Sequence, residues 1–419
     1  MRELHTSLRH FRAFIMVGRL QNVRRTADAI CLTQPAVSLA ISKFEEDVGA
    51  QLFDRRNYGI FLTDAGKILA ARVERMFSQI VGALEAVGAT TNGSESYEAL
   101  GSRITRAHIR ALSMLIGSEG DNGSEAVSRT TALRSVRDME NVLGVEFLLH
   151  DADGYSINKT GRRFSERLDV ALLEIINGLD EIDAEAGRRR GTIRVGAMPL
   201  SGSFILTHVL ADITARSSKV NFEVSSGDYA KLIEGLRRAE TDVIIGAVAE
   251  TSHAGDLSCV RLASFPFVLV TRAGHPMAGR TAPLTNDELA SLFWVTPKPG
   301  TTRRHAYDNL IKGLARSPAE TIQASSYSSL QILLADGNRV GLLTRFEYEQ
   351  SREISDLVVL PCRQIRPMVD IGLTCRTNWA PTALQREFTD LVHDYGRKIA
   401  MQMGAALPQD DTDHNEIAP

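Results

Sequence analysis

The 419-residue sequence has few cysteines and lacks the common signatures of catalysis. Its four cysteines are scattered without a CxxC pair, which favours free thiols over a disulfide framework or a redox sensor. No GxxxxGKS phosphate loop, GxGxxG turn, GxSxG elbow or HExxH pair is present. None of the ten histidines is paired with cysteine or carboxylates at a spacing typical of metal sites. These absences argue against an enzyme, and we expect no cofactor and no metal site.

Long apolar runs are also missing. The residues from Met1 to His5 do not begin an apolar signal segment, and no run is long enough to cross a bilayer. We therefore expect a cytoplasmic protein without a membrane partner. Apolar residues make up 43% of the chain and charged residues 24%, as in ordinary globular proteins, and the length suggests three or more compact units.

The most informative segment is a short amphipathic one near the N-terminus. Val37, Ile41 and Phe44 recur at helical spacing, which predicts a helix with one buried face. Pro35 suits the start of this helix, because N–H groups of the first turn have no partner within a helix, and Gly49 suits its end. The opposite, polar face is therefore free to enter a groove of DNA.

The helix is followed by Leu52-Phe53-Asp54-Arg55-Arg56, a turn at residues 57–59, and Leu62-Thr63-Asp64-Ala65-Gly66. As a whole, residues 34–66 resemble the winged helix-turn-helix of the LysR-type transcriptional regulators, a bacterial family. The resemblance implies a helix in the major groove and arginines on or beside a wing, where they hold phosphates or reach into a minor groove. The DNA-binding residues that it implies are Gln34, Pro35 and Ser38 at base edges, Ser42 and Lys43 near the backbone, and Arg55 and Arg56.

The charge distribution agrees with a DNA-binding module. The net charge of the chain is only −3, but residues 1–75 contain 12 Lys and Arg against 8 Asp and Glu. A basic module on a slightly acidic chain is what contact with DNA phosphates requires.

A weaker copy of the same segment recurs 95 residues later. Residues 49–53 align with residues 144–148, and Glu45 aligns with Glu140. Residues 101–162 therefore look like a second, degenerate winged helix-turn-helix. Most members of the family carry one such unit, so the chain departs from the usual plan.

The two copies differ in chemistry. The second has Arg129, Arg134 and Arg137 along its expected recognition segment, and these side chains suit phosphates or guanine. However, His150 and Asp151 replace the two wing arginines, and an acidic group there would repel the DNA backbone. Glycines in the preceding segment weaken the helix expected there. We favour a degenerate copy used for dimer or domain packing, while a second DNA contact stays open.

Two long helices are expected, over residues 65–92 and 163–190. Apolar residues recur at steps of three and four in both. The first stripe is Leu69, Val73, Met76, Ile80, Leu84 and Val87, and the second is Phe164, Leu168, Leu172, Ile175, Leu179 and Ile182. A dimer seam is favoured for the first helix over packing on its own domain, and the resemblance also implies a dimerising linker helix, in a dimer or a tetramer.

Strand and helix patterns alternate from Gly191 onward, which predicts an α/β region with a parallel sheet covered on both faces. Two lobes joined by two crossings resemble the periplasmic-binding-protein-like effector domain of the same family. The expected plan is residues 1–64 as the DNA-binding domain, 65–92 and 163–190 as linker helices, 101–162 as the second winged unit, 191–266 with 369–400 as lobe I, 267–368 as lobe II, and 401–419 as a disordered acidic tail.

An effector would sit between the lobes, because ligands collect at the carboxyl ends of strands and helix N-termini favour anions. The resemblance puts effector contacts on loops after the strands, at Ser201, Ser203, Ala247, Thr301, Thr302, Arg303 and Ser326. The alternative for each Ser or Thr is a plain helix cap, and for Arg303 a surface charge. An organic acid, which helix ends and Arg303 would complement, is the first expectation, and a sugar or neutral metabolite stays open.

We therefore expect a LysR-type regulator that binds double-stranded DNA and a small-molecule effector, associates with itself and contacts RNA polymerase. Ligand in the cleft would alter lobe closure and thereby the spacing of the DNA-binding domains. The rival classes are an enzyme with an attached DNA module, which turnover of a ligand would reveal, and an architectural DNA binder, which would not need two lobes.

Overall fold

The computed structural model describes residues 7–56, 59–91, 95–117, 126–151, 154–188, 191–199, 201–216, 220–248, 255–318, 320–324, 326–352 and 355–403. The chain divides into two compact units. One holds residues 1–190 with 237–239, and the other holds residues 191–236 with 240–419. None of the described helices is long and apolar enough to span a membrane.

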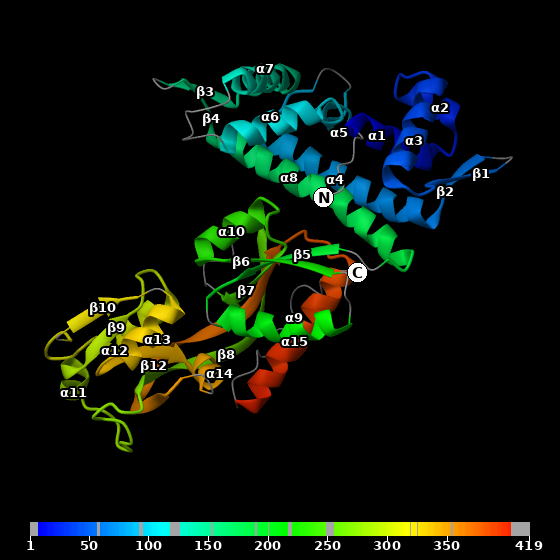
Figure 1. The fold of residues 1–419 in the computed structure, drawn as a ribbon. Coiled ribbons are helices and arrows are strands. Elements are labelled where there is room, and N and C mark those ends of the chain that lie inside the picture. Colours follow the sequence, from blue (N-terminus) through cyan, green and yellow to red (C-terminus); the bar gives the residue numbers. More distant parts are fainter. Residues whose placement is uncertain are drawn as a thin grey trace. The chain divides into compact units, whose positions relative to one another are not determined.

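The first unit begins with three short helices, a two-stranded hairpin and a long helix (Figure 1). These elements are α1 (Leu8–Leu20), α2 (Val23–Ala29), α3 (Gln34–Val48), β1 (Phe53–Arg56), β2 (Gly59–Leu62) and α4 (Asp64–Ala86). The ring of Phe44 on α3 packs edge-on against Phe11 and Phe14 of α1, at 5.0 and 5.1 Å between centroids. Gly49 ends α3 with a φ of 71°, a conformation that glycine adopts without strain.

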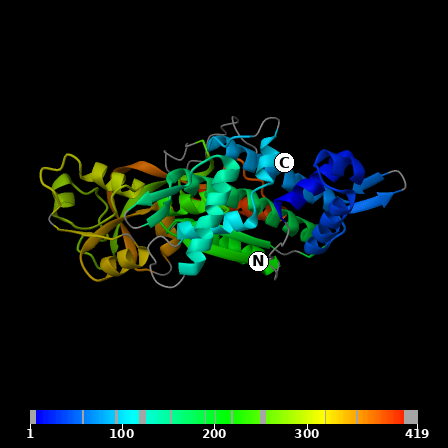
Figure 2. The ribbon, with the colours of Figure 1, turned by 90° about the horizontal axis from the view of Figure 1, so that it is seen from above.

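Partly buried polar contacts hold the hairpin to the helices. A carboxylate oxygen of Glu45 on α3 accepts hydrogen bonds from the backbone N–H groups of Leu52 and Phe53, at 2.8 and 3.0 Å. Thr63 caps α4 by accepting from the N–H of Gly66 at 3.0 Å. A Cβ atom on Gly66 would lie 2.1 Å from the carbonyl oxygen of Leu52, so only glycine fits there. Figure 2 shows the hairpin projecting beyond the helices.

The same unit continues with a further set of elements. These are α5 (Tyr97–Gly101), α6 (Arg106–Gly117), α7 (Ala126–Leu143), β3 (Leu148–Asp151), β4 (Gly154–Ile157) and α8 (Lys159–Glu185). A carboxylate oxygen of Glu140 on α7 accepts from the backbone N–H groups of Phe147 and Leu148. Asn158 caps α8 by accepting from the N–H of Gly161 at 2.7 Å.

Helices α4 and α8 pack side by side within the chain (Figure 1). The stripe residues Leu69, Val73, Met76, Ile80 and Leu84 on α4 are fully buried, and Phe164, Leu168 and Ile175 on α8 belong to the same core. The prediction that the stripe of α4 forms a seam with a second chain therefore needs correction, because a helix of the same chain covers it.

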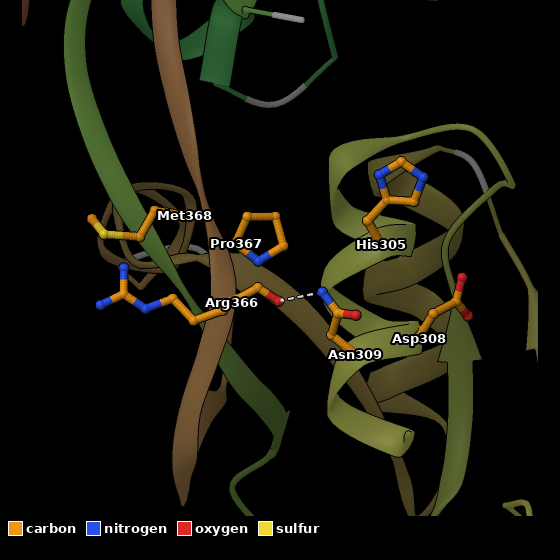
Figure 3. A pocket seen from close by; sticks show the side chains of 6 residues that line it. All are labelled: His305, Asp308, Asn309, Arg366, Pro367 and Met368. Carbon is orange, nitrogen blue, oxygen red and sulfur yellow. Dashed lines mark hydrogen bonds between the residues drawn. The ribbon is translucent and has the colours of Figure 1, made fainter. Parts of the chain in front are cut away.

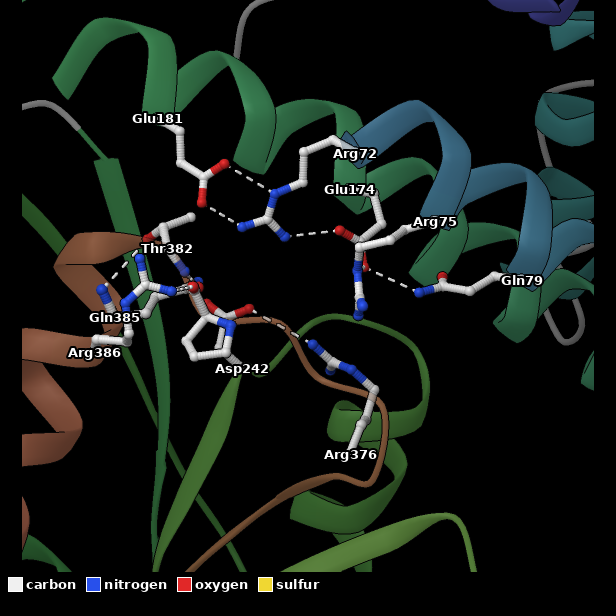
Figure 4. Close-up of polar contacts among 11 residues, drawn as sticks. Arg72, Arg75, Gln79, Glu174, Glu181, Asp242, Arg376, Thr382, Gln385 and Arg386 are labelled. Carbon is white, nitrogen blue, oxygen red and sulfur yellow. Dashed lines mark hydrogen bonds and ion pairs between the residues drawn. The ribbon is translucent and has the colours of Figure 1, made fainter. Parts of the chain in front are cut away.

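A buried ion network joins these two helices (Figure 4). The guanidinium of Arg72 on α4 bonds Glu174 at 2.8 Å and also Glu181, both on α8, and only 6% of the Arg72 and Glu174 side chains is exposed. Gln79 donates to Glu174 at 3.0 Å, and Arg167 donates to the carbonyl of Gly82 at 3.0 Å. Because residue numbers rise along α4 as they fall along α8, the two helices are antiparallel. Burial opposes the charge on Arg72, but its hydrogen bonds with Glu181 and Glu174 outweigh burial and raise its pKa.

The second unit is built on one eight-stranded sheet in the order β10-β9-β11-β8-β12-β7-β5-β6. Its elements are β5 (Gly191–Ala197), α9 (Ser201–Arg216), β6 (Val220–Ser226), α10 (Tyr229–Arg237), β7 (Val243–Ala247), β8 (Leu257–Arg272), α11 (Asn286–Ser291), β9 (Phe293–Thr296), α12 (Thr302–Ile311), β10 (Glu320–Gln323), α13 (Tyr327–Ala335), β11 (Arg339–Thr344), α14 (Arg345–Ser351), β12 (Leu357–Arg376) and α15 (Ala383–Gln402).

Two long antiparallel strands, β8 and β12, are shared by two smaller groups of strands. On one side β7, β5 and β6 are parallel to one another, and on the other side β11, β9 and β10 are parallel. The strands are therefore parallel within each lobe, while the antiparallel pair runs through both. This arrangement puts the carboxyl ends of β5 and β7 at one edge of a lobe, where the sequence predicts effector contacts.

A buried carboxylate braces the first lobe (Figure 4). Asp242 is fully buried and accepts from the N–H of Arg194 at 2.9 Å, while the guanidinium of Arg376 lies 3.9 Å away. Burial raises the pKa of Asp242, although Arg194 and Arg376 oppose that shift. Thr382 and Gln385 form a capping box that starts α15.

Candidate DNA-binding and effector sites

The outer face of α3 carries the polar residues expected to meet DNA. Gln34, Pro35, Ser42 and Lys43 are exposed, and Ser38 is half-buried. Beneath them, Val37, Ile41 and Phe44 are buried in the core of the unit. The N-terminus of the helix is capped by Thr33, whose hydroxyl accepts from the N–H of Ala36 at 3.4 Å. The described residues thus bring five predicted DNA-binding residues onto a single helix.

Sequence reasoning missed one residue of this face. Leu39 is 71% exposed, although a leucine of that size is usually buried. It lies four residues after Pro35 and three before Ser42, so it shares their face. Its position off the apolar stripe of Val37 and Ile41 is the signal that would have found it. An exposed leucine here suits apolar contact with a thymine methyl group in the major groove.

The two wing arginines differ in their surroundings. Both Arg55 and Arg56 are exposed on β1. The Nε atom of Arg56 bonds Asp54 at 2.8 Å, and its guanidinium lies 5.6 Å from the ring centroid of Phe61. Arg56 is thus partly committed to its own hairpin. Of the two, Arg55 suits phosphate contact better, because a phosphate would not need to compete with Asp54.

His10 completes a capping box at the start of α1, close enough to α3 to feel the charge of Lys43. The N–H of Ser7 donates to Nδ1 of His10 at 3.2 Å. Burial lowers the pKa of His10, and the nearby ammonium of Lys43 lowers it further, while Asp47 has the opposite effect. Burial is thus the main reason that this imidazole resists protonation, and Lys43 adds to it.

The first turn of α9 lies close to β7 of the sheet. A Cβ atom on Gly202 would come within 2.2 Å of the carbonyl oxygen of Ile245 on β7. Ser203 and Ala247 are both half-buried near this edge, so the structure brings these two predicted effector residues into one region. Ser201 begins α9, and its side chain lies outside the described residues.

The predicted effector hydroxyls of the second lobe cap helices. Thr301 caps α12 by accepting from the N–H of Arg304 at 3.1 Å, and its own hydroxyl donates to the carbonyl of Lys298 at 2.9 Å. Ser326 caps α13 by accepting from the N–H of Ser329 at 3.1 Å. Thr302 is half-buried at the first position of α12. A cap role, which was the alternative for Thr301 and Ser326, is thus present at both positions.

Arg303 is neither a surface charge nor a cation that is free to bind a ligand. Its guanidinium bonds both carboxylate oxygens of Glu347, at 2.7 and 2.8 Å, and the carbonyl of Leu342 at 2.9 Å. Glu347 is 1% exposed. Because removing the guanidinium would leave a buried carboxylate unpaired, Arg303 has a structural role that its position in the sequence did not reveal.

An ion pair spans the two lobes. Lys298, just after β9, lies 3.2 Å from Asp228, just before α10, and both side chains are more than half exposed. A backbone hydrogen bond from Lys231 and the bond from Lys298 lower the pKa of Asp228. Exposed pairs contribute about 0–1 kcal/mol, so this contact opposes lobe separation only weakly.

A pocket of about 550 Å³ lies elsewhere in the second unit (Figure 3). It is lined by His305, Asp308 and Asn309 of α12 and by Arg366, Pro367 and Met368 of β12. The side-chain amide of Asn309 donates to the carbonyl of Arg366 at 3.3 Å. None of the predicted effector residues lines this pocket. His305 is exposed at its edge.

Known proteins resemble the chain along most of its length. The HTH-type transcriptional regulator GalR of Pseudomonas putida is 24% identical over 380 residues, which cover 88% of this chain and 92% of that protein. OxyR of Escherichia coli, a DNA-binding transcriptional dual regulator, is 24% identical over 251 residues, 60% of this chain and 81% of that protein. The structure of full-length CbnR complexed with its target DNA matches 93% of this chain and 100% of that chain, at 15% identity and a TM-score of 0.40.

Two family models match adjacent parts of the fold. The bacterial regulatory helix-turn-helix of the lysR family matches residues 8–67, which contain α1 to β2 and the start of α4. The LysR substrate binding domain matches residues 186–397, half of the chain. The predicted combination of an N-terminal helix-turn-helix with an α/β effector domain is therefore confirmed, and so is the prediction that the chain is not an enzyme. The chain belongs to the LysR family of DNA-binding transcriptional regulators.

Proposed function

We propose that the chain reads DNA through the outer face of α3 and reports the presence of a small organic acid held between its two lobes. The observation that carries the DNA part is the division of α3 into a buried stripe and an exposed polar face. Gln34, Pro35 and Ser38 would meet base edges, with Leu39 beside them, and Arg55 would hold a phosphate. Ser42, Lys43 and Arg56 would lie near the DNA backbone.

Selection of duplexes from a random library tests this reading. The full chain should enrich a defined sequence, and Ser38→Ala should change the enriched sequence more than the overall affinity. Ser78→Ala is a matched control, because Ser78 is exposed on α4, away from α3. An identical enriched sequence for Ser38→Ala and the unaltered chain would reject base contact by α3.

The effector part rests on the helix N-termini that face the ends of the strands. Helices α9 and α12 begin beside Ser203 and Thr302, and free N–H groups at helix N-termini favour a carboxylate. Ala247 would line the same site, while Ser201, Thr301 and Ser326 would add hydroxyl contacts if their caps allow it. Since Arg303 is paired with Glu347, the acid preference depends on the helix ends.

Ligand-dependent thermal shift of the full chain tests the effector class. Small carboxylic acids should raise the unfolding temperature as the ratio of their concentration to their dissociation constant increases, while their neutral amides should not. A panel in which amides or neutral sugars stabilise the chain as well as the acids do would reject an acid effector.

We also propose that residues 101–162 form a second winged helix-turn-helix. Three features support this. Glu45 and Glu140, 95 residues apart, accept the same pair of backbone hydrogen bonds from their hairpins. The N–H of Thr105 donates to Nδ1 of His108 at 3.2 Å, just as the N–H of Ser7 donates to His10. The strands also pair in the same register, Phe53 with Leu62 and Leu148 with Ile157.

Self-association and contact with RNA polymerase stay predictions that the family resemblance implies. The described part of the first unit gives no support to a seam on α4, since α8 occupies it. If the chain self-associates, a surface of the second unit or another face of the first would have to supply the contact.

A further inference from the structure

Each winged unit of the chain precedes its own long helix, and these two helices are antiparallel. The first hairpin leads into α4, the second leads into α8, and pairing in opposite directions puts the two hairpins at opposite ends of the helix pair (Figure 1). Helices α3 and α7 therefore have equivalent places on a nearly symmetric body. Such a body offers two recognition helices to one duplex.

The exposed face of α7 is basic. Arg134 and Arg137 are exposed and lie three residues apart, so they share one face of the helix. They stand 95 positions after Leu39 and Ser42, the exposed residues on the face of α3 that meets DNA in the proposed function. Arginine in these places supplies what phosphate oxygens and guanine edges need, namely charge and paired N–H donors.

The two arginines outnumber the acidic residue beside them. Asp138 is exposed, and its carboxylate lies 2.9 Å from Nε2 of His108 on α6, so one negative charge stands beside two positive ones. The guanidinium of Arg137 lies 4.6 Å from the ring centroid of Tyr155 on β4, which holds it beside the hairpin while the residue stays exposed. In contrast, the hairpin itself offers His150, whose Nδ1 lies 3.3 Å from the carbonyl of Gly154, in place of Arg55.

We propose that both winged units of a chain contact the same duplex, with α3 reading bases and α7 holding the adjoining DNA through Arg134 and Arg137. This inference rests on the proposed second winged helix-turn-helix, and it makes the two halves of the binding site unequal. The DNA beside α3 is specified by sequence, while the DNA beside α7 is held chiefly by charge.

Footprinting and salt-dependent affinity of the full chain test this. In Arg134→Gln/Arg137→Gln, affinity should fall on the order of tenfold and the slope of log affinity against log salt should flatten by about 1.8, or about 0.9 for each phosphate that is no longer neutralised. Protection should disappear on one flank and persist on the other. The control is Arg216→Gln/Arg397→Gln, which removes the same charge from exposed positions of the second unit.

The outcomes distinguish a failure of this inference from a failure of the proposed DNA recognition by α3. If the double variant keeps the salt slope and both protected flanks while Arg55→Ala weakens binding, the role of α7 is wrong and that of the first winged unit stands. If the unaltered chain protects no duplex, the DNA reading itself fails. The single variant Arg134→Gln controls for misfolding of the double variant, because it changes only one exposed side chain. It should flatten the slope of log affinity against log salt by about 0.9.

Discussion

The winged helix-turn-helix of residues 8–67 and the proposed second one share a framework and differ on the surface. In both, a glutamate at the same place clamps the hairpin, and a glycine, Gly66 or Gly161, begins the long helix against residues of that hairpin. Outside this framework, Lys43 gives way to Asp138 in the corresponding position. The residues that satisfy buried backbone groups are thus kept, while exposed ones have diverged, because only the former determine whether the unit folds.

The ion network between α4 and α8 should give the largest effect, since it joins the two winged units. Glu174→Ala would remove one of the two carboxylate partners of the buried Arg72. Because Glu181 still compensates its charge, we expect the free energy of unfolding to fall by about 3 kcal/mol, the lower end of the cost of breaking a buried pair. Hydrogen exchange of the α4 and α8 amides measures it. Glu85→Ala on the exposed side of α4 is the control, and equal exchange rates in the two variants would contradict a joining role.

The two framework glycines should differ in how well they tolerate a methyl group. In Gly66→Ala the new Cβ would lie 2.1 Å from a backbone oxygen, whereas in Gly161→Ala it would lie 2.8 Å from a methyl group of Ile157. Because a side chain shifts more easily than a backbone, we expect the free energy of unfolding to fall by about 3 kcal/mol in Gly66→Ala and by about 1 kcal/mol in Gly161→Ala. Gly82→Ala, with nothing within 4 Å, should be neutral or stabilising.

Thermal unfolding of the three glycine variants checks that order. Equal losses for the first two variants would mean that the N-terminus of α4 adjusts as freely as that of α8. The two winged units would then share less of their framework than the bond pattern indicates.

Substitutions of wing residues should have a smaller energetic effect than the changes above, and this effect is on DNA affinity. Arg55→Ala should weaken binding to all duplexes several-fold and flatten the salt slope by about 0.9, because one phosphate is left without its cation. His150→Arg would give the second hairpin the same residue and should strengthen binding. Salt titrations of the two variants measure both effects, and the absence of any change in Arg55→Ala would reject wing contact.

The sequence predicted what repeating patterns encode and missed what single side chains do. The stripe of α4 is visible from periodicity, but periodicity does not say whether the covering helix comes from the same chain. The second apolar stripe predicted α8, and this helix supplies Glu174 opposite Arg72. Arg303 was predicted as an effector contact because of the loop on which it was expected. Its partner Glu347 lies 44 residues away, and a pairing over that separation leaves no local signal in the sequence. Leu39 was passed over because a leucine in a helix suggests a core.

The smallest expected effect concerns His10, whose ring accepts a hydrogen bond from the backbone N–H of Ser7 at the start of α1. Burial and Lys43 lower the pKa of His10, so the unfolded chain binds this proton more readily and the first winged unit loses stability as the pH falls below about 6.5. In Lys43→Ala the charge contribution disappears, and the His10 pKa should rise, with Asp47 now acting against burial alone. NMR titration of the ring measures the shift. An unchanged His10 pKa in Lys43→Ala would show that the basic face of α3 does not affect this imidazole.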